Sequence, residues 1–76
     1  MKLSELKQGE SAVIQSFNSL SIETRKKLMV MGLLPKTPIT LLRRAPLGDP
    51  LQVGVRGVSL ALREAIADEV LVEKTA

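Results

Sequence analysis

The stretch Ala45–Pro50 (APLGDP) constrains the fold more than any other feature of this sequence. Its two prolines fix φ, and the glycine between them tolerates positive φ. The residues on either side have the composition of strands, so the stretch predicts the tip of an antiparallel hairpin with a long, proline-stiffened loop. Asp49 is its one ionisable side chain, which indicates a loop that shapes or presents a surface.

Strands are predicted wherever apolar and polar side chains alternate and β-branched residues are frequent. Such a pattern covers Ser11–Phe17. The hairpin strands are expected over Ile39–Arg44 and Leu51–Arg56, on the two sides of the loop. A last strand is expected over Glu69–Glu73, after a turn.

A helix of about three turns is predicted over Ile22–Met31. Ser21 is suited to accept a hydrogen bond as its N-cap, and Gly32 is suited to end it in a left-handed conformation. Side chains that recur at helical spacing and are expected to face the core are Thr24, Leu28 and Met31.

A second, short helix is predicted over Leu60–Ile66, with Ser59 as its N-cap. Few strands, one hairpin and no β-α-β repeat favour a mainly β chain with two short helices, folded as a small antiparallel sheet closed into a barrel. The whole chain, residues 1–76, is expected to form one domain. A domain of this size is marginally stable, so a partner or weak self-association would stabilise it.

The composition argues against an enzyme and against a metal carrier. The sequence has no histidine and no cysteine, which are the usual ligands of zinc and ferrous iron, and histidine is the commonest general base. Its eight carboxylates show no paired spacing. We therefore expect no catalytic residues, no metal site and no cofactor. No signal peptide or long apolar span is visible, so a cytoplasmic protein without membrane insertion is expected.

Positive charge is concentrated in the first part of the chain. Residues 1–44 contain eight Lys or Arg and three Glu, whereas residues 45–76 contain three Lys or Arg and five Asp or Glu. A basic face can meet nucleic acid, but barrels that bind single strands add aromatic stacking residues, and this chain has one aromatic residue, Phe17. The missing aromatics argue equally against a groove for proline-rich peptides. Nucleic-acid binding and peptide binding stay as alternatives to protein docking.

Apolar residues beside the predicted turns point to protein docking. We expect the helix end, the connector after it and the hairpin tip to meet, with Leu33 buried beneath them and basic residues, including Arg44, at the rim. A chain this small cannot bury every apolar residue there, and an apolar patch with a charged rim is typical of docking surfaces. The residues expected to contact the partner are Lys26, Met29, Leu34, Lys36, Leu47 and Asp49.

Four segments of the sequence resemble one known family, in consistent order and spacing. They are LSELKQGE (3–10), RKKLMVMGLLP (25–35), APLGDP (45–50), and SLALR (59–63) with Ala65. The chain is similar to the FeoA family, small cytosolic proteins of bacterial ferrous iron uptake. The resemblance covers residues 2–73 and implies an SH3-like β-barrel. It also implies a partner, the membrane ferrous iron transporter FeoB with its cytosolic GTP-binding domain, which would recruit the protein to the inner face of the membrane.

The sequence departs from the family pattern at one corner, because Lys36 stands where the family usually has glycine. If that corner needs positive φ, lysine costs about 1 kcal/mol or more there. Domains of this family also form the C-terminal barrel of metal-dependent repressors, so a free-standing relative of that barrel is a further alternative. Since the chain lacks histidine and cysteine, we expect an adaptor or regulator of iron uptake rather than an iron carrier.

Overall fold

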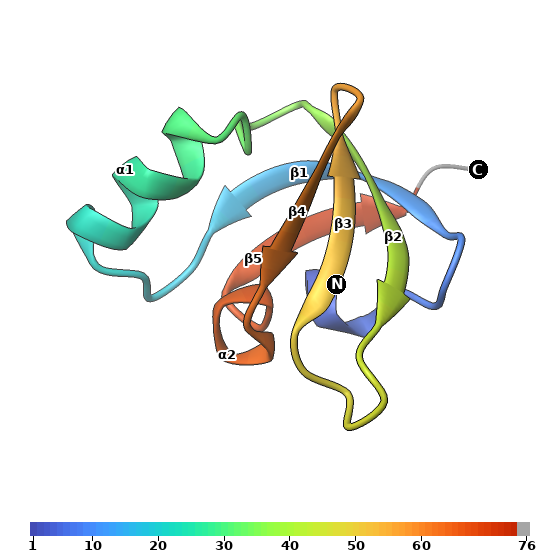
Figure 1. Ribbon diagram of the computed structural model, residues 1–76. Coiled ribbons are helices and arrows are strands. Elements are labelled where there is room, and N and C mark those ends of the chain that lie inside the picture. The colour runs from blue at the N-terminus through green and yellow to red at the C-terminus, as the bar shows by residue number, and fades with distance from the viewer. Residues whose placement is uncertain (75–76) are drawn as a thin grey trace.

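The computed structural model describes residues 1–74, and a five-stranded antiparallel sheet carries the fold (Figure 1). The strand order across the sheet is β4-β3-β2-β1-β5. The sheet curves into a barrel-like form without closing fully, which confirms the predicted mainly β class. The elements are η1 (Leu3–Glu5, a 3₁₀ helix), β1 (Ser11–Phe17), α1 (Ile22–Val30), β2 (Pro38–Arg44), β3 (Leu51–Val55), β4 (Val58–Leu62), α2 (Glu64–Ala67) and β5 (Val70–Lys74).

One hydrophobic core lies inside the curved sheet. β3 shows how the sequence builds it, because Leu51, Val53 and Val55 are buried and alternate with two partly exposed residues. Phe17, the one aromatic residue of the sequence, is partly buried and packs against this core. The buried apolar residues are Leu3, Leu6, Ala12, Ile14, Leu28, Leu33, Ile39, Leu41, Leu51, Val53, Val55, Leu62, Ala67, Val70 and Val72.

The strands predicted from alternation are confirmed to within one residue at each end. β1 has the predicted bounds. β2 begins at Pro38 rather than Ile39, and β3 ends at Val55 rather than Arg56. β5 is shifted by one residue toward the C-terminus. β2 and β3 pair antiparallel on the two sides of Ala45–Pro50, so the predicted hairpin is confirmed.

The second predicted helix is wrong over its first half. Where a helix was expected from Leu60 onward, the chain forms β4, and α2 begins only at Glu64. The cause is the turn before β4, in which Arg56 has φ 52° and Gly57 has φ 80°. Two consecutive residues with positive φ make a tight hairpin turn whose twist matches the flanking strands. The chain therefore reverses at once and pairs with β3.

The residue expected to cap that helix has another role. Ser59 lies within β4, opposite Gly54 of β3. α2 has Arg63 at its N-cap position, and that side chain makes no capping hydrogen bond. The Oδ1 atom of Asp49 instead accepts a hydrogen bond of 2.9 Å from the backbone N–H of Glu64. The loop between β2 and β3 thus holds the beginning of α2.

α1 begins where predicted and ends one residue earlier, at Val30. The Ser21 Oγ atom accepts a hydrogen bond of 3.2 Å from the backbone N–H of Thr24, which confirms the predicted N-cap. Leu28 is buried as expected, and Thr24 is half-buried. The N-terminus of α1 is therefore set by local sequence signals alone.

The C-terminus of α1 explains why Met31 does not enter the core. Gly32 has φ 98°, and its N–H donates to the Met29 carbonyl at 3.0 Å. The N–H of Leu33 donates to the Leu28 carbonyl at 2.9 Å. This pair of bonds is the Schellman motif, which reverses the chain and brings the residue after the glycine onto the helix. Leu33 is fully buried, whereas Met31 is 41% exposed, so the expectation for Met31 is wrong.

Candidate docking site

α1 lies beside the curved sheet (Figure 1), and it buries little of its own surface. Of its nine residues, Leu28 is the one that is buried. Ile22 is 70% exposed and Val30 is 87% exposed, although both are large and apolar. A helix that leaves apolar side chains uncovered is a candidate for contact with another molecule.

The exposed apolar residues of α1 share one side of the helix. At about 100° per residue, positions 22, 23, 26 and 30 lie on the side opposite Leu28, and position 29 lies about a quarter of a turn from Leu28, next to position 22. Met29 is 38% exposed, and Lys26 is exposed between the apolar residues. We call this set the α1 face: Ile22, Lys26, Met29 and Val30.

The chemistry of the α1 face is apolar, with an excess of positive charge around it. Val30 and Met31 line a shallow hollow together with Lys26 and Lys27. The lysine stems are themselves apolar, so they extend such a surface while their ammonium groups stay in water. α1 holds three basic residues and one acidic residue, Glu23, which lies on the same side of the helix as the α1 face. The arrangement is suited to an apolar side chain of a partner flanked by carboxylates.

The corner between α1 and β2 carries Leu34 and Lys36. Leu34 is half-buried and Lys36 is exposed. Lys36 has φ 67°, so the corner does require the left-handed conformation in which glycine is usual. Its backbone N–H donates to the Ile14 carbonyl at 2.6 Å. That bond joins the corner to β1 and holds the lysine in its strained conformation.

The hairpin tip presents Leu47, which is 96% exposed. The loop is closed by its own backbone, because the Gly48 N–H donates to the Ala45 carbonyl at 2.7 Å and the Ala45 N–H donates to the Pro50 carbonyl at 3.0 Å. The Asp49 carboxylate faces α2 and caps it. Leu47 is therefore held out into solvent by a loop that is fixed at both ends.

The base of the hairpin is also fixed, through Arg44. This residue, expected at the rim of the docking surface, is half-buried. Its guanidinium donates to the backbone carbonyls of Ser4 and, at 3.3 Å, Leu6, and it lies 3.8 Å from the Glu64 carboxylate. Arg44 therefore joins the hairpin to η1 and α2.

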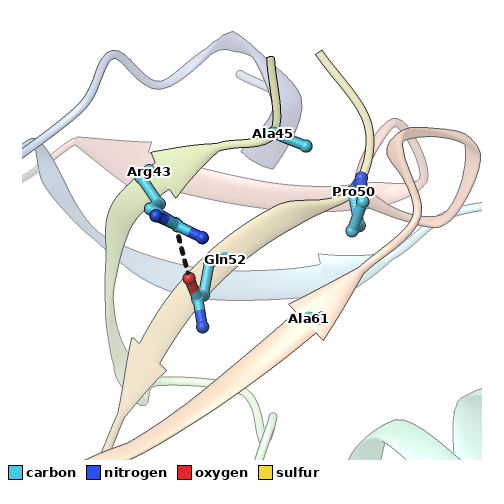
Figure 2. A pocket seen from close by; sticks show the side chains of 5 residues that line it. All are labelled: Arg43, Ala45, Pro50, Gln52 and Ala61. Atoms are coloured by element: carbon cyan, nitrogen blue, oxygen red, sulfur yellow. Dashed lines mark hydrogen bonds between the residues drawn. The ribbon is translucent and has the colours of Figure 1, made fainter. Parts of the chain in front are cut away.

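A shallow hollow lies on the outer face of the sheet below the tip (Figure 2). In it the Arg43 Nε atom donates to the Gln52 side-chain oxygen at 2.9 Å. Gln52 of β3 lies directly opposite Ala61 of the neighbouring strand β4. The residues that line the hollow are Arg43, Ala45, Pro50, Gln52 and Ala61.

The structure does not bring the expected contact residues together. Leu34 and Lys36 come just before β2, whereas Leu47 and Asp49 come just after it. A seven-residue strand separates the two groups by roughly 20 Å, and Figure 1 shows the connector and the tip at opposite ends of β2. The expected meeting of helix end, connector and tip is therefore wrong. The α1 face with its adjoining corner is one surface, and the tip is another.

Sequence reasoning missed two residues of the α1 face, Ile22 and Val30. Both follow from the helix geometry once Leu28 is taken as the centre of the buried side, because they lie between about a third and a half of a turn away from it. The prediction that Met31 faces the core made the buried side of the helix too wide. With less of the helix expected to be exposed, Ile22 and Val30 were not recognised as exposed residues.

Two absences within the described residues, 1–74, bear on the site. No three acidic side chains in this range gather closely enough to hold a metal ion. No helix in the same range is long and apolar enough to span a membrane.

Comparison with known proteins gives one consistent family. The model of the FeoA domain family matches residues 1–74. A curated Fe(2+) transport protein A/Fe(2+) transporter FeoB fusion protein from Porphyromonas gingivalis is 34% identical over 73 residues, which cover 96% of this chain. The match spans only 8% of the fusion protein's length.

Solved structures of similar proteins confirm the SH3-like fold. The NMR structure of the FeoA protein from Chlorobium tepidum is 39% identical, with a TM-score of 0.94, and covers 100% of this chain and 71% of that one. The FeoA of Stenotrophomonas maltophilia, crystallised with zinc and described as an SH3 domain protein, is 32% identical, with a TM-score of 0.83 and coverage of 96% and 89%. A manganese-dependent transcriptional repressor is 12% identical, with a TM-score of 0.88. The match covers 99% of this chain and 41% of the repressor chain. This last likeness is one of fold alone.

Proposed function

Since the chain belongs to the FeoA domain family, we propose that it docks on the cytosolic region of a FeoB-type ferrous iron transporter and modulates that transporter without catalysis of its own. The observation that carries the proposal is the Porphyromonas gingivalis protein, in which a related domain and the transporter form one chain. A covalent link raises the effective concentration of two contacting domains. Separate chains of the same kind need a contact surface strong enough to replace that link.

The α1 face supplies the main part of that surface. Its apolar side chains, Ile22, Met29 and Val30, remain in contact with water in the free protein, and their burial against a partner is favourable. Lys26 lies among them, and its positive charge favours a partner surface that is negatively charged. We therefore expect the contact surface of the transporter to have apolar residues next to Asp or Glu.

The corner continues this surface beyond the helix. Leu34 adds apolar area, and Lys36 adds a second exposed cation held on a fixed backbone. A fixed backbone reduces the entropy that a contact residue loses on binding. Leu34 and Lys36 are therefore proposed to contact the same region of the transporter as α1.

The hairpin tip is proposed as a second contact. Leu47 is a large apolar residue held almost wholly in solvent by a closed loop, which suits it to enter a pocket of the partner. Asp49 contributes to this contact indirectly, because its carboxylate is engaged with α2. Docking through both surfaces would place this cytoplasmic protein at the inner face of the membrane.

Calorimetry of the full chain with the purified cytosolic region of a FeoB-type transporter tests the proposal. Met29→Asp changes the α1 face and Leu47→Asp changes the tip, and each is expected to weaken binding at least about tenfold if its residue is buried in the complex. Leu42→Asp is the matched control, since Leu42 is a half-exposed leucine in the middle of β2, outside both surfaces. Folding of each variant is checked by circular dichroism.

The outcomes separate the parts of the proposal. Normal binding by both folded variants would show that neither surface docks. An absence of binding by the unaltered chain would refute the docking itself. Equal rates of GTP hydrolysis by the transporter region with and without the chain would show that any modulation acts on another step, such as iron passage measured in vesicles.

A further inference from the structure

The curved sheet has one unprotected edge, which is β4. β4 is the outermost strand beyond β3, and no other strand of residues 1–74 pairs with it. Its sequence, VSLAL, contains no proline and no charged residue. Its register with β3 is continuous, without a bulge. Proteins ordinarily protect edge strands with such residues or with bulges, and within residues 1–74 β4 has neither.

The opposite edge, β5, is closed by the beginning of the chain. The N-terminal amino group of Met1 donates to the Val72 carbonyl at 3.0 Å, and the Val72 N–H donates to the Met1 carbonyl at 2.8 Å. Lys2 adds an isolated bridge to Leu71. A molecule with a single open edge can pair with one further strand, and the dimer formed in this way has no open edge left. Pairing at β4 therefore stops at the dimer.

The hairpin geometry decides which backbone groups of β4 point outward. In a two-residue hairpin, the residues on either side of the turn, here Val55 and Val58, exchange backbone hydrogen bonds. Bonded and non-bonded pairs then alternate along the strands, so Leu60 also bonds to β3. The N–H and C=O groups of Ser59 and Ala61 point away from β3. Both residues are exposed, and both have small side chains.

We propose that β4 pairs antiparallel with β4 of a second copy of this chain, about a two-fold axis at Leu60. In this register Ser59 of each copy faces Ala61 of the other, and each of these pairs exchanges both of its backbone hydrogen bonds. Leu60, half-buried at the open edge, meets its own counterpart. The two inner apolar layers then continue from one copy into the other.

The outward backbone groups favour this register over its neighbours. With the axis at Leu60, Ser59 and Ala61 of each copy both find partners inside β4. Moving the axis by one residue in either direction pairs Ser59 or Ala61 with its own counterpart. The other of the two then falls opposite Gly57 or Arg63, which lie outside the strand. The strand therefore complements itself best about Leu60, and self-complementarity is what a two-fold interface requires.

Analytical ultracentrifugation of the full chain, together with amide NMR over the same concentrations, tests the pairing. The paired strands have only five residues each, so the interface is small and belongs to the class of weak protein–protein contacts. Dimers are expected with a dissociation constant of about 0.1 to 1 mM. The amide signals of Ser59 and Ala61 are expected to shift most as the concentration rises.

Two variants block the edge in different ways. Ala61→Pro removes an outward N–H that β3 does not use, and Ala61→Lys places a charge on the edge. Each is expected to weaken self-association at least about tenfold. Ala65→Lys is the matched control, because Ala65 is an exposed alanine of α2 that lies off the edge.

Three results would overturn the inference. One is sedimentation of the unaltered chain as a monomer up to millimolar concentration. Another is equal self-association by the folded Ala61→Lys and Ala65→Lys variants. The third is a shift of the Ser59 and Ala61 amides only when the cytosolic region of the transporter is added, which would assign the edge to an extended segment of that partner.

Discussion

Replacing Lys36 with glycine tests whether the corner between α1 and β2 is strained. Lys36 holds φ 67°, and an L-residue in the left-handed region costs about 1–2 kcal/mol relative to its ordinary conformations. Glycine adopts this region without that cost, and it keeps the backbone N–H that donates to the Ile14 carbonyl at 2.6 Å. The Lys36→Gly variant therefore loses strain without losing a backbone contact.

The magnitude follows from two opposing terms. Relief of the left-handed strain raises the free energy of unfolding by about 1–2 kcal/mol, and the greater freedom of glycine in the unfolded chain lowers it by about 0.4–1 kcal/mol. The expected net gain lies between about 0 and 1.6 kcal/mol, and its midpoint of about 0.8 kcal/mol corresponds to a rise in Tm of about 3–6 °C for a domain of this size.

Urea unfolding followed by circular dichroism measures the change. Lys7→Gly is the matched control, because Lys7 is also exposed and its φ is not positive. The free energy of unfolding of that variant is expected to fall by about 0.4–1 kcal/mol, because glycine has greater freedom in the unfolded chain. The strain argument is wrong if Lys36→Gly is destabilised as much as Lys7→Gly.

Two other side chains give predictions about stability. Asp49→Ala removes the acceptor of the Glu64 N–H and is expected to lower the free energy of unfolding in urea by about 1 kcal/mol. Asp49→Asn retains an acceptor and should recover most of the loss; equal losses in both variants would exclude the capping role. The hydrogen bond from Lys74, followed by one from the backbone N–H of Lys7, lowers the pKa of Glu10. This stabilisation is present above the unfolded-state pKa and is lost as pH falls through the folded pKa. The stability gap between the unaltered chain and Glu10→Gln should therefore close on acidification, and a gap that is independent of pH would contradict this.

Some elements could be predicted because their signals are local. The N-cap at Ser21 and the glycine at position 32 act within one turn of α1. The prolines and glycine of Ala45–Pro50 define a hairpin tip in the same way. None of these features depends on distant contacts, so the sequence alone determines them.

β4 could not be predicted with the same ease, because its signal is ambiguous. Asn or Asp before glycine is the usual sign of a tight hairpin, and here arginine occupies that position. The segment Val58–Leu62 contains leucine and alanine, which favour helices, and it becomes a strand by pairing with β3. Tertiary pairing therefore overrides local propensity.

The division of the docking site follows from strand length rather than from any motif. Seven extended residues in β2 hold the corner and the tip apart, whatever the chemistry of Leu34 or Leu47. The sequence indicates which apolar residues a small core leaves exposed. It does not indicate at which end of a strand each of these residues lies.

The α1 face and the β4 edge belong to different elements and use different interactions, so docking and self-pairing should be separable. The α1 face offers apolar side chains and a cation, whereas the β4 edge offers backbone groups. Met29→Asp should therefore weaken binding to the transporter region and leave self-association unchanged, because Met29 lies on α1 and contributes no backbone group to the β4 edge. Ala61→Pro should do the reverse. If either variant impaired both processes while remaining folded, the two surfaces would be coupled, and self-pairing would have to be treated as a step in docking.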